Sequence, residues 1–321
     1  MKMRVPALAA AALLLLATLA QAQSWPSRPV RIIVPFASGG PADIYARVLG
    51  QRLQEALGQP FVIEDRPGGG SLIGTDAVAK SAPDGYTLLM MSNTHTVNES
   101  LYSKKPFELM RDFVPVSPVN FSDLVLVVHP SVPVNSLREL LELVKSKPHA
   151  LNYASSGPGT PYHMAGELFK AMAGLDIVHV PYKGSSGART DVMGGQVQMM
   201  FDAITTMAPN IRAGKVKAMG TTGSKRSSVL PEVPTLSEAG VPGYETVIWI
   251  GVMAPTGTPK AVVDKLNADI VKIIGSPDIR EAWAKQGAQP MIMTPDQFGE
   301  FLKKDVVKWA KVVQVSGAKV D

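Results

Sequence analysis

The chain has 321 residues, no cysteine, and 32 basic residues against 27 acidic ones. The lack of cysteine excludes disulfides, thiolate metal sites and a lipid anchor attached through a cysteine. The small positive excess gives no indication of nucleic acid or of an anionic membrane as a partner.

The first residues have the pattern of an export signal. Lys2 and Arg4 precede a mostly apolar run over residues 5–20, and Ala20-Gln21-Ala22 has the small-x-small form of a cleavage site. Removal of residues 1–22 leaves 30 basic residues against 27 acidic ones. The apolar run is short for a membrane span. We therefore predict a periplasmic mature chain from which the signal peptide, residues 1–22, has been removed, with no lipid anchor.

Strand patterns alternate with helical patterns along most of the mature chain. Strands are predicted at residues 30–35, 61–65, 86–92, 124–129, 151–155, 177–181, 197–202 and 217–221. This alternation predicts an α/β fold with mostly parallel sheets. The mature length exceeds the ~100–150 residues of a typical domain, so two lobes are expected.

The alternation breaks at residues 113–130 and again at residues 233–255. Two breaks indicate a chain that leaves the first lobe, builds the second, and returns, with helices at 260–274 and 295–313 completing the first. We predict one lobe from residues 24–123 plus 251–321 and the other from 124–250. Hinge strands are expected near 124–129 and 247–253.

One motif occurs in both predicted lobes. In "VPFASGGPADIYAR" (34–47) a strand runs into a small-residue loop, and Pro41 opens a helix; "YASSGPGTPYHMAGELF" (153–169) repeats this with Pro161. A helix N-terminus presents free N–H groups and a partial positive charge, which favour a carboxylate or phosphate. We expect backbone N–H groups, helped by the hydroxyls of Ser38, Ser155 and Thr160, to bind such an anion.

Four charged residues near these loops have specific expectations. Asp43 either caps its helix or contacts the ligand, and Asp202 either caps the following turn or accepts a bond from a ligand amine or hydroxyl. Arg47 is expected at the surface, whereas Lys183 is the one basic residue that could reach the cleft.

Other chemistries fit the sequence less well. Ser155 or Ser156 with His163 and Asp202 could form a nucleophilic triad, but no G-x-S-x-G motif occurs. The five histidines are too scattered for a metal-ligand pair at helical spacing. The glycine-rich stretch "RPGGGSLIGT" (66–75) matches neither of the two nucleotide-binding motifs, G-x-G-x-x-G and the Walker motif. We therefore expect no metal and no cofactor.

The chain resembles the Bug-type extracytoplasmic solute receptors, the TctC-like binding components of tripartite tricarboxylate transporters. The resemblance rests on "WPSRPVRIIVPFASGGPADIYAR", "VIEDRPGGGSLIGTDAVAKSAPDGYTLL", "LNYASSGPGTPYHMAGELF", "VPYKGSSGARTDVMGGQVQMMFD" and "LPEVPTLSEAGVPGYE". It implies a two-lobe periplasmic binding protein of the Venus-flytrap, type II-like kind, with a hinge of crossing strands. It also implies a monomer, not an enzyme, that captures a small organic acid and delivers it to membrane permease subunits. The acid would be a di- or tricarboxylate, an acidic amino acid or a related carboxylate.

The resemblance also implies where the ligand lies. Loops 36–43 and 155–160 would hold a carboxylate, and segment 92–102 with Asp202 would complete the wall. The sequence departs from the family pattern at Asn98-Glu99, where the family usually has Asn-Pro before x-Leu-Tyr. This difference bears on how the local helix begins and on the pocket floor near Thr94. The predicted ligand-binding residues are Phe36, Ala37, Ser38, Gly39, Gly40, Asp43, Thr94, Ser155, Ser156, Gly157, Gly159, Thr160, His163 and Asp202. The alternatives are a ligand sensor for a signalling system and an exported hydrolase.

Overall fold

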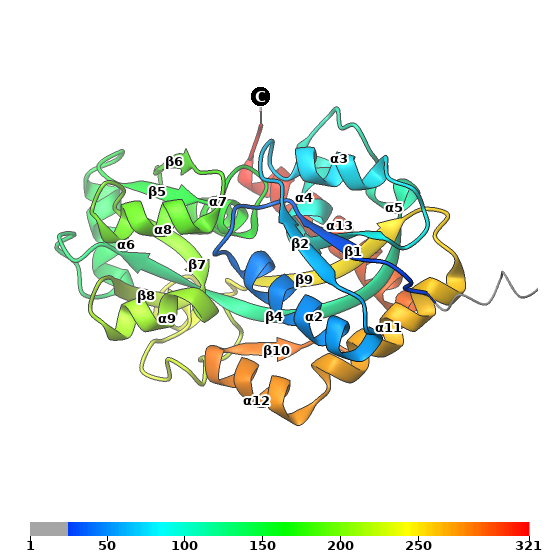
Figure 1. Cartoon of the computed structure of the whole chain (residues 1–321). Coiled ribbons are helices and arrows are strands. Elements are labelled where there is room, and N and C mark those ends of the chain that lie inside the picture. Colours follow the sequence, from blue (N-terminus) through cyan, green and yellow to red (C-terminus); the bar gives the residue numbers. More distant parts are fainter. Residues whose placement is uncertain (1–24, 321) are drawn as a thin grey trace, which may run out of the picture.

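The computed structural model describes residues 25–320, which form an α/β protein around one long curled sheet (Figure 1). The predicted signal peptide lies outside the described residues. Over residues 25–320, no helix is both long and apolar enough to cross a bilayer.

The α/β class predicted from the sequence is confirmed, and its elements follow one another as expected. The strands are β1 (Val30–Val34), β2 (Phe61–Asp65), β3 (Thr87–Ser92), β4 (Phe113–Val128), β5 (Asn152–Ser155), β6 (Val178–Pro181), β7 (Met199–Ala203), β8 (Lys217–Thr221), β9 (Val247–Pro255) and β10 (Ala288–Pro290). The helices are α2 (Pro41–Leu57), α3 (Leu72–Ala79), α4 (Asn93–Leu101), α5 (Leu109–Asp112), α6 (Leu137–Ser146), α7 (Pro161–Ala173), α8 (Ser185–Met193), α9 (Ile204–Arg212), α10 (Leu236–Ala239), α11 (Lys260–Ile274), α12 (Pro277–Gln286) and α13 (Pro295–Ser316).

Strand β4 belongs to both halves of the sheet. Its residues 113–123 pair with β9, and its residues 124–128 pair with β7, so the strand order is β2-β1-β3-β9-β4-β7-β5-β6. Figure 1 shows β4 running across the molecule from the half around β1 to the half around β5. The sequence suggested two separate runs because Pro115 and Pro118 interrupt the pattern. Both prolines lie at register shifts in the ladder with β9, where a missing N–H is tolerated.

The sheets are less parallel than the sequence predicted. β1 pairs in parallel with β2 and β3, and β5 pairs in parallel with β6 and β7. β4 and β9 run antiparallel to every strand that they pair with among the described residues. The parallel pairs come from βαβ units, whereas the crossing strands enter each half from the other and so run against its parallel strands.

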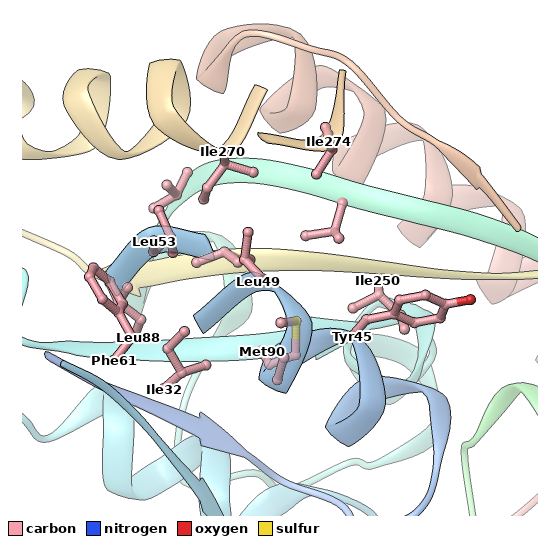
Figure 2. Close-up of a cluster of buried hydrophobic side chains, with 14 of the residues drawn as sticks. Ile32, Tyr45, Leu49, Leu53, Phe61, Leu88, Met90, Ile250, Ile270 and Ile274 are labelled. Atoms are coloured by element: carbon pink, nitrogen blue, oxygen red, sulfur yellow. The ribbon is translucent and has the colours of Figure 1, made fainter. Parts of the chain in front are cut away.

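Helix α2 shows how the sequence builds the first half. Pro41 opens the helix at its first position, and Tyr45, Leu49 and Leu53 recur every four residues on one buried face. Gly58, with φ of 70°, ends it in the left-handed conformation. Burial of each leucine contributes about 1.5–3 kcal/mol. Figure 2 shows this face packed with Ile32, Phe61, Leu88, Met90, Ile250, Ile270 and Ile274.

A smaller apolar cluster joins the two halves away from the sheet. Met164 of α7 is fully buried against Val97 and Leu101 of α4 and Trp309 of α13. α7 follows β5 in one half, whereas α4 follows β3 in the other. The first turns of α7, which follow one of the predicted loops, therefore pack against α4 and α13 of the opposite half.

Candidate functional site

Four helices begin at one place between the two halves of the sheet. α2 and α4 follow β1 and β3 in one half, whereas α7 and α8 follow β5 and β6 in the other. Residues from the starts of all four helices line a cavity of about 30 Å³, called the inner pocket below. Its lining consists of Phe36, Ala37, Gly40, Pro41, Ala42, Ser92, Thr94, Ser156, Pro161, Tyr162, Ser185 and Ile248.

The inner pocket has hydroxyls and apolar groups but no formal charge. Among residues 25–320, no aspartate, glutamate, lysine, arginine or histidine contributes to its lining. The N-terminus of each helix carries about half a positive elementary charge. The pocket is therefore electropositive through its backbone, which suits an anion and supplies no counter-charge for a cation.

Two of the four helix starts are capped by their own side chains. Ser92 Oγ accepts a bond from the Thr94 N–H at 3.3 Å, and Thr160 Oγ1 accepts one from the His163 N–H at 3.4 Å. α2 and α8 instead begin after Gly40 and Gly184, which have no side chain to cap them. First-turn N–H groups of α2 and α8, one helix from each half, thus have no side-chain cap and can donate to a ligand.

A second cavity of about 270 Å³, called the mouth below, adjoins the inner pocket and shares Phe36 and Ser156 with it. Lys183 is its one charged lining residue within the described part of the chain, so this lysine reaches the mouth and not the inner pocket. The mouth is lined by Pro35, Phe36, Gly68, Gly69, Gly70, Ser71, Tyr102, Ser156, Gly157, Pro158, Thr160, Pro181, Tyr182 and Lys183.

The loops before α2 and α8 touch across the rim of the inner pocket. Ser186 Oγ donates to the Ser38 carbonyl at 3.0 Å. A Cβ placed on Gly184 would lie 2.5 Å from Ala37 Cβ, which is closer than real side chains approach. The two halves are therefore in direct contact at this rim, and glycine at position 184 is what allows the contact.

Asp43 is turned toward its own loop. One carboxylate oxygen accepts a bond from the Gly39 N–H at 2.8 Å, and the other lies 2.6 Å from Arg47 Nε. Asp43 lines neither cavity. α2 has no side-chain cap, and the carboxylate of Asp43 instead fixes the loop that leads into the helix. Arg47 is half exposed and also pairs with Asp65, in agreement with its predicted surface position.

The hydroxyls of Ser155 and Thr160, which were predicted to help bind the anion, make hydrogen bonds within their own loop. Ser155 Oγ is 2.6 Å from His179 Nε2 and accepts a bond from the Gly157 N–H at 3.1 Å. Thr160 Oγ1 donates to the Gly157 carbonyl at 2.7 Å. These bonds shape the turn before α7, and Thr160 also lines the mouth.

His163 also supports this loop from behind. Its Nδ1 accepts a bond from the Gly159 N–H at 3.2 Å, and its ring stacks on His179 with centroids 4.2 Å apart. Burial lowers the pKa of His163 to about 4 and that of His179 to about 3. Both rings are neutral near pH 7, and His163 Nδ1 can therefore remain an acceptor.

Asp202 is fully buried and is paired inside the protein. One of its oxygens lies 2.6 Å from Arg189 Nε, and the other accepts a bond from the Ala203 N–H at 2.9 Å. Burial raises its pKa, and the nearby Arg189 guanidinium opposes that rise. Asp202 lines neither cavity, and α9, which follows it, begins without a side-chain cap; its charged partner is Arg189.

Helix α4 is regular despite the departure at Asn98-Glu99. It begins at Asn93 with a capping box, and Asn98 lies in its last turns. Asn98 Nδ2 donates to the Gly70 carbonyl at 2.9 Å, which ties α4 to the glycine-rich loop at the mouth. Thr94 keeps its predicted place in the lining of the inner pocket.

The TctC family, described as tripartite tricarboxylate transporter family receptors, matches residues 45–318. The chain belongs to this family. The Bug-type, TctC-like resemblance is therefore confirmed, and the family is one of periplasmic substrate-binding receptors and not of enzymes.

Relatives in this TctC family include a named protein and two ligand-bound structures. The protein BugT of Bordetella pertussis is 41% identical over 301 residues, covering 93% of this chain and 92% of BugT. The structure described as R. palustris Rpa4515 with adipate has a TM-score of 0.89, with 36% identity, 92% of this chain and 100% of that chain covered. MatC (Rpa3494) from Rhodopseudomonas palustris with bound malate has a TM-score of 0.85, with 34% identity, 90% of this chain and 100% of that chain covered.

The structure of this TctC receptor brings together part of the predicted site. Phe36, Ala37, Gly40, Thr94 and Ser156 line the inner pocket, and Phe36 and Ser156 line the mouth as well. Gly157 and Thr160 line the mouth alone. The residues that line neither cavity are Ser38, Gly39, Asp43, Ser155, Gly159, His163 and Asp202. They lie at the rim or behind the two loops and shape them.

Sequence reasoning about this TctC receptor missed the start of α8. Ser185 lines the inner pocket, yet only Lys183 of its loop was considered. A signal was present, because Pro181 ends a strand and the small residues Gly184-Ser185-Ser186-Gly187 span the cap and the first turn of the helix that follows. Tyr162 was overlooked because the residue after Pro161 was compared only with Ala42 of the first loop.

Proposed function

We propose that this protein is a periplasmic receptor that captures a small organic acid in the inner pocket and delivers it to a tripartite tricarboxylate-type permease. The proposed ligand is a di- or tricarboxylate, an acidic amino acid or a related carboxylate. The observation that carries the proposal is the convergence of four helix N-termini on a pocket lined, within the described residues, by no charged side chain. The adipate and malate bound to the two related proteins support it.

The energetics favour a carboxylate over a neutral ligand. Hydrogen bonds to a charged group contribute about 1.5–3 kcal/mol each, roughly twice a neutral bond. The helix starts after Gly40 and Gly184 can supply such bonds from opposite halves of the protein. An acid held by both halves makes contacts that exist only when the halves are together, which is what links binding to closure.

We further propose that the two halves act as hinged lobes. The sequence suggested residues 24–123 plus 251–321 as one lobe and 124–250 as the other. The strand register supports a slightly earlier return, because residues 247–250 of β9 already pair with residues 120–123 of β4, and Ile250 pairs with β3 as well. We therefore place the second crossing point before Val247. In this proposal the described conformation is a closed one, which the contact between Ser186 and Ser38 supports.

The remaining parts of the proposal concern the partners and the location of the protein. The partners would be the ligand and the membrane subunits of the permease, with a monomeric receptor and no cofactor, metal or nucleic acid. The receptor would reach the periplasm through the signal at residues 1–22, which is then removed, and would carry no lipid anchor.

The two alternatives are a sensor and a hydrolase. A sensor would use the same pocket and would differ only in its membrane partner. The hydrolase is poorly supported, because Ser155 bonds to His179 and not to His163, and Asp202 is paired with Arg189. No charge relay from Asp202 through His163 to a serine is formed within residues 25–320.

Calorimetry on the purified mature protein tests the proposal. Malate, adipate, citrate and glutamate are titrated separately after the protein has been unfolded and refolded to remove any acid acquired in the cell. We expect saturable binding of at least one acid, together with compaction in small-angle scattering. A protein that binds none of them, or that hydrolyses carboxylic esters, would contradict the assignment. A sensor would bind the acid and be encoded beside a sensor kinase instead of permease subunits.

A further inference from the structure

We propose that the hydroxyl of Tyr162 determines specificity by donating a hydrogen bond to a second oxygen acceptor of the ligand, so that the receptor prefers diacids to monoacids. This inference rests on the proposed function. It concerns one atom, Tyr162 Oη, and explains why an otherwise costly group is kept at that place.

Tyr162 is the second residue of α7, is 3% exposed, and lines the inner pocket. Its hydroxyl is buried without a hydrogen-bond partner among residues 25–320. Other buried tyrosines differ, because the Tyr153 hydroxyl donates to Glu167 at 2.5 Å and the Tyr244 hydroxyl donates to the Ala165 carbonyl at 2.7 Å. An unpartnered buried hydroxyl costs about 1–3 kcal/mol. An acceptor supplied by the ligand would remove that cost.

Ser185 is the hydroxyl neighbour of Tyr162 on the pocket wall, but no hydrogen bond of ordinary geometry joins the two, so the Tyr162 hydroxyl remains available to an acceptor of the ligand. Behind the pocket wall, both oxygens of Asp202 are already engaged by Arg189 and by the Ala203 N–H. Arg189 Nη2 lies 3.5 Å from Ser185 Oγ, the next hydroxyl of the wall. Burial raises the pKa of Tyr162 well above its ordinary value, so the hydroxyl keeps its proton and can donate.

The need for a second acceptor follows from the different groups that the helices present to the inner pocket. α2 and α8 can offer backbone N–H groups to one carboxylate, because no side chain caps them. Thr160 caps α7, so the contribution of α7 to the pocket comes through its side chain at Tyr162. A monoacid held by α2 and α8 leaves this hydroxyl unpartnered, whereas a second carboxylate or an equivalent oxygen completes its bonding.

The test compares acids of equal chain length. Calorimetry measures the affinity of adipate against hexanoate and of malate against butyrate, for the wild type and for Tyr162→Phe. We expect the diacid affinity to fall roughly 5- to 100-fold in the variant, with the monoacid affinity changed less than about twofold. The ligand-free variant should melt at the wild-type temperature or above it, since it loses an unpartnered hydroxyl. Tyr244→Phe is the matched control: it should lower the melting temperature and leave the affinity ratio unchanged.

The possible failures are distinguishable. A wild type that binds none of these acids contradicts the proposed function for them, and the Tyr162 inference falls with it. A wild type that prefers diacids, together with a variant that keeps the same preference, overturns the role of Tyr162 while the proposed function stands. An equal loss for the diacid and the monoacid also overturns it, because Tyr162 would then contact the carboxylate that both acids share.

Discussion

The two aspartates near the inner pocket are both neutralised by arginines. Asp43 pairs with Arg47 one turn along α2, and Asp202 of β7 pairs with Arg189 of α8. Neither carboxylate is left free to repel a bound acid, and neither arginine lines the inner pocket as a counter-charge. Recognition is thereby left to backbone N–H groups and hydroxyls, whose directions discriminate between ligands by geometry more than by total charge.

Replacing Asp202 should damage stability more than specificity. Asp202→Asn leaves the Arg189 charge buried without its partner, and breaking a buried pair in this way costs about 3–5 kcal/mol. Urea denaturation should show that loss, while calorimetry on the folded variant should give the wild-type order of preference among amino, hydroxy and plain acids. Glu281→Gln, which breaks an exposed pair with Lys285, should leave the midpoint of urea unfolding almost unchanged. A reordered preference would restore a ligand-reading role to Asp202.

At the level of elements, the site is formed by helix N-termini that follow strand ends. A residue that caps such a helix can affect both the stability of the protein and the shape of the binding loop. Thr160 caps α7 beside the mouth, and Thr294 caps α13 in a capping box that lines neither the inner pocket nor the mouth. Each threonine caps the N-terminus of its helix, but only Thr160 lies beside a cavity. They therefore separate the effect of a lost cap from the effect of a disturbed binding loop.

Thr160→Ala and Thr294→Ala should each lower the free energy of unfolding by about 1 kcal/mol. Thr160→Ala should also weaken acid binding several-fold, because it removes the bond from Thr160 Oγ1 to Gly157 that shapes the loop. Thr294→Ala should bind as the wild type does. Denaturant titration and calorimetry on both variants check this, and equal affinities in the two variants would contradict a role of the Thr160 cap in binding.

The sequence predicted the helices and strands better than it predicted the contacts between side chains that are distant along the chain. The starts of α2 and α7 were identified because Pro41 and Pro161 follow loops of small residues, a local signal. The start of α8 lacks a proline, and the strand before it, β6, is short and partly exposed, so the same signal was weaker. The pairing of Asp202 with Arg189 and the unpartnered hydroxyl of Tyr162 depend on which elements meet in space. No local pattern contains that information.

On the scale of the whole molecule, binding requires the halves to meet at the rim formed by Ala37 and Gly184. Gly184→Ala places a methyl group where Ala37 Cβ lies 2.5 Å away, and its backbone, with φ of 177°, accepts alanine without strain. We expect a folded protein of wild-type stability that closes poorly and binds acids at least about tenfold more weakly. Gly214→Ala is a control for stability, because a Cβ there meets nothing within 4 Å, although its φ of 68° costs some strain. Wild-type compaction in small-angle scattering for Gly184→Ala would argue against closure at this rim.

Acidification should destabilise the protein through its buried histidines. Burial lowers the pKa of His95 and of His163 to about 4 and that of His179 to about 3, below the ~6.5 of an unfolded chain. The unfolded state therefore binds more protons between pH 6.5 and 4, so stability is full above about pH 6.5 and is lost as the pH falls. Each histidine contributes a slope of up to about 1.4 kcal/mol per pH unit.

Urea denaturation at several pH values between 7 and 4.5 measures this slope. His163→Gln should reduce the slope by about one histidine's share. Asp123 acts in the opposite direction, because burial raises its pKa to about 6. An unchanged slope in His163→Gln would show that His163 is protonated equally in the folded and unfolded states.

The long strand β4 has a consequence for how the protein folds and can be divided. The two halves of the sheet share one strand: residues 113–123 of β4 pair within one half, and residues 124–128 pair within the other. A fragment cut between Asp123 and Leu124 would expose unpaired strand edges in both pieces. The two lobes should therefore melt as one cooperative unit and not as independent domains, and functional fragments would have to be separated in surface loops instead.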